Sequence, residues 1–83
     1  MSDEAKKLLD QILEAMFFAE LCPPHEKAAR EQERDALLAR ASDMSGRSAG
    51  VIKEALLKAR YPQYRSERLK AELASVPPKL RRQ

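Results

Sequence analysis

Residues 3–21 read DEAKKLLDQILEAMFFAEL and carry the clearest structural signal in the chain. Apolar side chains recur in this stretch at steps of three and four residues, at Ala5, Leu8, Leu9, Ile12, Leu13, Met16 and Ala19. This spacing places them on one face of an α-helix. Ser2 or Asp3 can cap the helix, and the Pro23-Pro24 pair stops it. We therefore predict a first helix at 3–21 with a continuous apolar face.

Three further helices are predicted from the same kind of spacing. The helix expected at 24–43 is almost wholly charged in its first half, so we expect only its second half to have much to bury. Gly46 suits the turn that follows, because glycine adopts a left-handed conformation at helix ends. Shorter helices are expected at 48–60 and 63–76. Because the sequence shows no strand-like alternation, we predict an all-α protein, a small bundle of three or four helices.

The size of the chain limits its organisation to one domain. With 83 residues and 9.4 kDa, we expect a single helical domain at 1–76 and a short basic tail at 77–83. Cys22 is the one cysteine, which excludes an intramolecular disulfide and fits a reducing, cytoplasmic location. The acidic start does not resemble a signal peptide, and the longest apolar stretch has five residues where a membrane span needs about 20. We expect no association with a membrane.

Charge is distributed unevenly along the chain. Residues 1–50 hold seven basic and ten acidic side chains, a net charge of −3, whereas residues 51–83 hold nine and three, a net charge of +6. A basic region of this kind presents a cationic face to phosphates or to an acidic partner, or is neutralised by the acidic half within the fold.

Catalytic chemistry finds little support in the sequence. Cys22 and His25 flank the proline pair, but a zinc site needs three or four ligands, and only a second copy of the chain would supply the rest. With two glycines in the whole chain, a glycine-rich phosphate loop is not possible. We therefore predict that the chain is not an enzyme, and we expect no metal, no cofactor and no small-molecule substrate.

The first helix suggests a surface for protein contact. Phe18 lies nearly opposite the centre of the apolar face, so it either completes a core covered on two sides or extends an exposed apolar patch. We predict an adaptor, regulator or assembly factor that binds a protein partner and self-associates, as a homodimer, through its first helix. The candidate interface residues are Leu9, Leu13, Met16, Phe17, Phe18 and Leu21.

The hairpin around Gly46 suggests an alternative. The turn Gly46-Arg47-Ser48, followed by Ile52-Lys53-Glu54-Ala55-Leu56, resembles the helical part of ribbon-helix-helix and antitoxin-type repressors, which implies DNA binding. That family reads the major groove with an N-terminal strand, whereas residues 23–30 have no strand alternation. The same segment is loosely similar to the helical lid of AAA ATPases, which implies only a fold. Neither resemblance identifies a family.

The alternative function is thus a DNA-binding regulator that uses the hairpin at 36–60 and the basic C-terminal third. Its candidate residues are basic or polar side chains that can reach phosphates. They are Arg47, Ser48, Lys53, Arg60, Arg65, Arg68, Lys70, Arg81 and Arg82.

Overall fold

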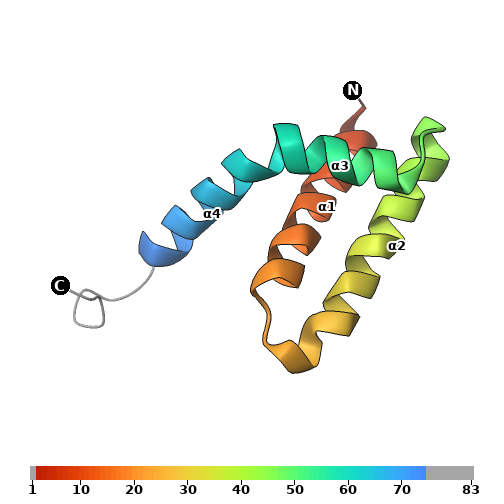
Figure 1. The fold of residues 1–83 in the computed structure, drawn as a ribbon. Helices are drawn as coiled ribbons and strands as arrows, with labels where there is room; N and C mark the ends of the chain where they lie inside the picture. The colour runs from red at the N-terminus through yellow and green to blue at the C-terminus, as the bar shows by residue number, and fades with distance from the viewer. Residues whose placement is uncertain (1, 75–83) are drawn as a thin grey trace.

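A computed structural model describes residues 2–74, and within them the chain is entirely built from helices and short turns (Figure 1). The elements are α1 (Asp3–Leu21), the 3-10 helix η1 (Pro24–Glu26), α2 (Lys27–Ser45), α3 (Ala49–Ala59) and α4 (Tyr61–Ala74). The all-α bundle prediction is confirmed. Arg81, Arg82 and the predicted tail lie outside the described residues, as do the last two positions of the helix predicted at 63–76.

Helix α1 has the predicted bounds, and both of its ends have a local cause. The Ser2 Oγ accepts a hydrogen bond from the backbone N–H of Ala5 at 3.2 Å, which caps the helix. Asp3 and Glu4 lie in the first turn, where their charge complements the helix dipole. At the other end Cys22 is extended, because the residue before a proline avoids helical geometry.

The helices enclose one small core. α1 and α2 run antiparallel as a hairpin, and α3 packs across it (Figure 1). Ile52 of α3 lies near Leu8 and Leu9 of α1, whereas α4 begins beside Glu20, near the end of α1. Ile12 of α1 and Leu38 of α2 are the most deeply buried apolar residues, each 2% exposed. Leu56 of α3 and Tyr61 of α4 complete the cluster. All four helices therefore contribute to the core, and α1 contributes most of it.

Helix α2 buries Leu38 in its second half, as expected, and its charged first half contacts α1 through polar and basic side chains. Lys27 Nζ donates a hydrogen bond to the carbonyl oxygen of Ala19 at 3.1 Å. The side chain of Arg34 is only 16% exposed. Long basic side chains bury their aliphatic stems while keeping the charge near water. The first half of α2 thus covers the end of α1 with the aliphatic parts of its basic side chains.

The junction of α3 and α4 corrects an expectation. We predicted that the fourth helix begins at 63, but α4 begins at Tyr61. Proline is tolerated in the first turn of a helix, where its missing N–H has no helical partner. The backbone N–H of Tyr64 donates to the carbonyl oxygen of Arg60 at 3.1 Å, so α4 follows α3 directly.

The turn between α2 and α3 depends on Gly46. Its φ of 77° is left-handed, and its N–H donates to the carbonyl oxygen of Ser42 at 2.9 Å. Ser48 then caps α3, its Oγ accepting from the N–H of Val51 at 3.2 Å. The predicted turn at Gly46 is confirmed, but α2 continues to Ser45, two residues beyond the predicted end at 43, and α3 begins at Ala49, one residue later than predicted.

The Gly46→Ala variant is expected to lose about 1 kcal/mol of stability, because a Cβ is unfavourable at positive φ. Gly50→Ala is the matched control, since both positions have open space for a Cβ and Gly50 is helical. Gly50→Ala is expected to gain about 0.5 kcal/mol. Urea unfolding of the two variants measures the difference. Equal effects would contradict the role given to the left-handed cap.

Among residues 2–74, no helix combines the length and the apolar character that crossing a membrane requires.

Candidate interaction surface

Three of the six predicted interface residues lie in the core. Leu13, Met16 and Phe17 are buried against other helices of the same chain, so a partner of the folded protein does not reach them. Leu9 is half-buried, whereas Phe18 and Leu21 are exposed. The apolar face of α1 is therefore mostly used by the fold itself.

Phe18 lies at the edge of the core beneath two guanidinium groups. The ring is 36% exposed. The guanidinium carbon of Arg30 is 5.5 Å from its centroid, and that of Arg68 is 5.3 Å away. Arg68 also lies 5.2 Å from the ring of Phe17. Cation-π contacts of this kind attach α2 and α4 to α1. Phe18 is therefore neither a fully covered core residue nor part of a freely exposed apolar patch.

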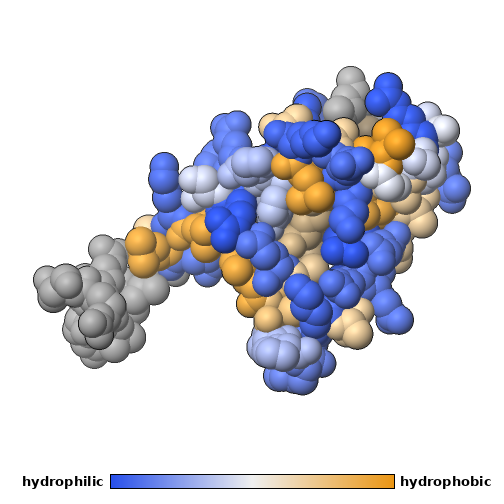
Figure 2. All heavy atoms as spheres, viewed as in Figure 1, coloured by the Kyte–Doolittle hydropathy of each residue, from blue (hydrophilic) through white to orange (hydrophobic). Residues whose placement is uncertain are grey.

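The most apolar opening lies elsewhere, between the start of α1, the end of α2 and the start of α3. We call it the α1–α2–α3 groove; its volume is about 460 Å³. Its apolar lining consists of Ala5, Leu8, Leu9, Ile12, Ala41, Met44, Ile52 and Leu56. Met44 is 51% exposed. On the largely hydrophilic surface, apolar side chains gather near the α2–α3 turn and near the end of α4 (Figure 2).

Polar groups are few in the α1–α2–α3 groove. They belong to Ser2, Ser45 and Arg47. The backbone at Arg47 is fixed, because its N–H donates to Ser45 Oγ at 3.2 Å and its carbonyl accepts from Ser42 Oγ. Within residues 2–74 the guanidinium of Arg47 has no hydrogen-bond or ion-pair partner. The groove therefore offers an apolar surface with one available cation at its mouth.

A second opening of about 250 Å³ gathers basic residues that are distant in sequence. Lys27, Arg34 and Lys53 line it, together with Leu57 and Tyr61. Lys27 is bonded to the Ala19 carbonyl, and Arg34 pairs with Asp35 at 2.9 Å. Two of the three cations are thus already engaged in the folded chain.

Glu20 connects α1 to α4. Its carboxylate accepts a hydrogen bond from the hydroxyl of Tyr61 at 2.5 Å and one from Arg65 Nε at 2.7 Å. The hydrogen bond from Tyr61 holds the pKa of Glu20 below its ordinary value. Burial, and then the bond to Glu20, raises the pKa of Tyr61 well above its ordinary value. Sequence reasoning missed this contact, because the helices predicted at 48–60 and 63–76 leave Tyr61 outside any helix.

The Tyr61→Phe variant is expected to show a weaker loss of stability at alkaline pH than the wild type. Below pH 10 the tyrosine is protonated in both states. Above it, the unfolded chain releases the proton while the folded chain retains it, so Tyr61 lowers the free energy of unfolding by about 1.4 kcal/mol per pH unit. The two proteins differ only at position 61, so the difference between their declines isolates the contribution of Tyr61. Urea unfolding at pH 9 and 11 checks this, and an equal decline in both proteins would contradict it.

The contribution of Glu20 to stability depends on pH in the opposite direction to that of Tyr61. The lowered pKa of Glu20 gives a contribution that is fully present above the ordinary glutamate pKa. It is lost as the pH falls through the pKa of the folded state. The bond from Tyr61 to Glu20 therefore favours the folded chain across the neutral range.

The candidate DNA-contacting residues do not form one free set. Arg65 pairs with Glu20 at 2.7 Å, and Arg68 pairs with Glu14 at 3.6 Å and with Glu72 at 3.5 Å. Ser48 is used as a helix cap, and Lys53 lines the basic opening. In the part of the chain that the structure describes, Arg47, Arg60 and Lys70 are without an ion pair. The acidic half of the chain thus neutralises part of the basic third.

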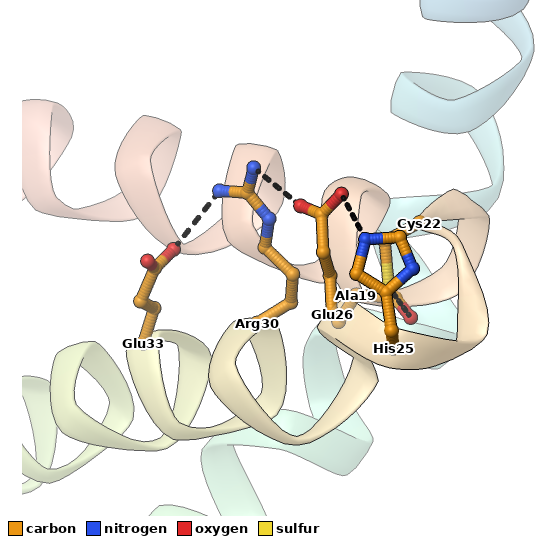
Figure 3. A network of polar contacts seen from close by, with 6 residues as sticks. All are labelled: Ala19, Cys22, His25, Glu26, Arg30 and Glu33. Carbon is orange, nitrogen blue, oxygen red and sulfur yellow. Dashed lines mark hydrogen bonds and ion pairs between the residues drawn. The ribbon is translucent and has the colours of Figure 1, made fainter.

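Cys22 and His25 enter separate local contacts. The thiol donates to the Ala19 carbonyl at 3.7 Å, while His25 Nε2 lies 3.6 Å from Glu26. Glu26 and Glu33 flank Arg30 at 3.2 and 3.3 Å, which completes the network shown in Figure 3. Residues 2–74 hold no group of three His, Cys, Asp or Glu side chains placed to bind a metal ion.

Comparison of the chain with protein-family models, with curated proteins and with solved structures gave no match.

Proposed function

We propose that this protein acts without catalysis, by binding another polypeptide in the α1–α2–α3 groove. The observation that carries the proposal is the exposed side chain of Met44 over an apolar opening of about 460 Å³. Apolar side chains in such openings supply most of the energy of protein interfaces. Methionine suits this use, because its flexible side chain adapts to a partner.

The proposed partner segment carries an apolar row and an acidic group. The row fills the space beside Leu9, Met44 and Ile52. The acid pairs with Arg47 at the mouth, where an ion pair helps to fix the orientation of the partner. We place this role, as adaptor, regulator or assembly factor, in the cytoplasm, where a lone thiol such as Cys22 stays reduced.

The Met44→Asp variant tests the proposal. In extracts of cells that produce the protein, the wild type is expected to sediment as a complex larger than its 9.4 kDa chain. Met44→Asp is expected to shift it to a smaller size, because an aspartate in the groove is costly to desolvate. Leu57→Asp is the matched control, since Leu57 is 41% exposed and lines the other opening. Identical complexes for Met44→Asp and the wild type would refute the proposal.

DNA binding remains the second candidate, supported by the unpaired cations Arg47, Arg60 and Lys70. If it is correct, a mixed-sequence duplex binds at low salt, and Arg47→Ala together with Lys70→Ala weakens the binding. Fluorescence anisotropy measures this, with Arg65→Ala as a control because Arg65 is already paired with Glu20. Affinity that is independent of salt would exclude this function.

A further inference from the structure

We infer that the segment bound in the α1–α2–α3 groove is the C-terminal half of α4 from a second copy of this chain. The inference rests on the proposed function and names its partner. It assigns two exposed apolar features of the fold to each other.

The first feature is the outer half of α4. Leu69 and Leu73 are spaced by four residues and so lie on one helix face. They are 37% and 63% exposed. The printed contacts of α4 with α1 come from its first half, through Tyr61 and Arg65, and from Arg68. Beyond Arg68 the helix projects from the bundle with apolar side chains uncovered on its surface (Figures 1 and 2).

The second feature is the groove, which the chain's own α4 does not reach. Ile52, near the start of α3, lines the groove, whereas α4 begins beyond the opposite end of α3. The hydrogen bond from Tyr64 to Arg60 continues the chain directly from α3 into α4. In Figure 1 α4 leads away from the turn between α2 and α3, where Ser45 and Arg47 line the groove. A second molecule meets no such restriction.

Charge favours this pairing. Asp3 lies beside Ser2 at one edge of the groove, and Asp43 precedes Met44 at the other. On α4, Lys70 adjoins Leu69. In residues 2–74 these three charges are without an ion pair. Glu67 of α4 is likewise available to Arg47 at the groove mouth. Each surface thus carries charges opposite to those of the other.

A two-fold arrangement satisfies both copies at once. Each molecule places its α4 in the groove of the other, so the dimer closes and leaves neither surface exposed. Burying Leu69 and Leu73 against Met44 and Ile52 then supplies the apolar contact twice.

Sedimentation equilibrium of the purified chain tests the inference. The wild type is expected to dimerise, and Met44→Asp and Leu73→Asp are each expected to weaken the dimer by at least about 100-fold, since both contacts are lost. Both positions are more than half exposed, so the variants are expected to keep their helical circular dichroism. Leu57→Asp is the control and is expected to dimerise like the wild type.

Mixing the two variants gives the sharpest result. Met44→Asp retains an intact α4, and Leu73→Asp retains an intact groove, so a mixed pair regains one of the two contacts. The mixture is expected to associate more strongly than either variant alone. A monomeric wild type, or a mixture no stronger than its components, would overturn the inference. If the pure wild type is monomeric while Met44→Asp still reduces the complex in extracts, only the inference fails; if Met44→Asp changes neither, the proposed function fails as well.

Discussion

Replacing Phe17 with alanine is expected to leave the protein largely unfolded. Phe17 is 4% exposed, and its ring meets that of Tyr64 edge-on at 6.3 Å and lies 5.2 Å from the guanidinium of Arg68. Removing a buried phenylalanine costs about 3–5 kcal/mol, and a small domain has about 5 kcal/mol or little more in total. Circular dichroism during urea unfolding measures the loss.

Phe18→Ala is the matched control for this variant, because the same side chain is removed one residue further along the helix. Phe18 is 36% exposed, and its loss removes contacts with the guanidinium groups of Arg30 and Arg68. Each such contact at a partly exposed ring contributes about 0.5–1 kcal/mol. We therefore expect a folded variant that is about 1–2 kcal/mol less stable. Equal losses at the two positions would contradict the packing described for α1.

Leu38→Ala is expected to have the second largest effect, a loss of about 2–5 kcal/mol. Leu38 is 2% exposed and, among the described residues of α2, is the one that is fully buried. The rest of α2 attaches through half-buried side chains and basic stems, so the cavity left by Leu38 lies where α2 is held to the core.

The matched control for Leu38→Ala is Leu57→Ala, because Leu57 is 41% exposed. It is expected to cost less than about 1 kcal/mol. Urea unfolding gives both values, and hydrogen exchange is expected to show reduced protection of α2 only in Leu38→Ala. A similar small loss in both variants would show that α2 does not depend on Leu38.

Helix α1 could be predicted to the residue because its signals are local. Apolar spacing, a serine cap and a proline pair lie within the segment itself, and all act at short range. The start of α4 was predicted two residues late for a local reason too. Pro62 can end one helix or stand in the first turn of the next, and the burial of Tyr61 against α1 favours the second.

The candidate surface could not be predicted in the same way, because it depends on how the helices meet. Phe17 and Phe18 have equal hydrophobicity, but the packing of the helices buries the first, whose ring meets Tyr64 of α4 edge-on, and leaves the second exposed. The groove combines Leu9, Met44 and Ile52 from three helices. One signal was present in the sequence: Met44 is the last apolar residue of α2, beyond the end of the helix that was predicted.

Photo-cross-linking from position 44 tests the central claim most directly. A benzoylphenylalanine placed at Met44 is expected to join the protein to a polypeptide in cells that produce it, whether a second copy or another chain. The same probe at Leu57 faces the other opening and is expected to give little or no adduct. The adduct from position 44 is expected to decline when Ile52→Asp is added, since Ile52 lines the same groove. No adduct at position 44, or equal adducts at both positions, would contradict the claim that this groove is where the protein binds its partner.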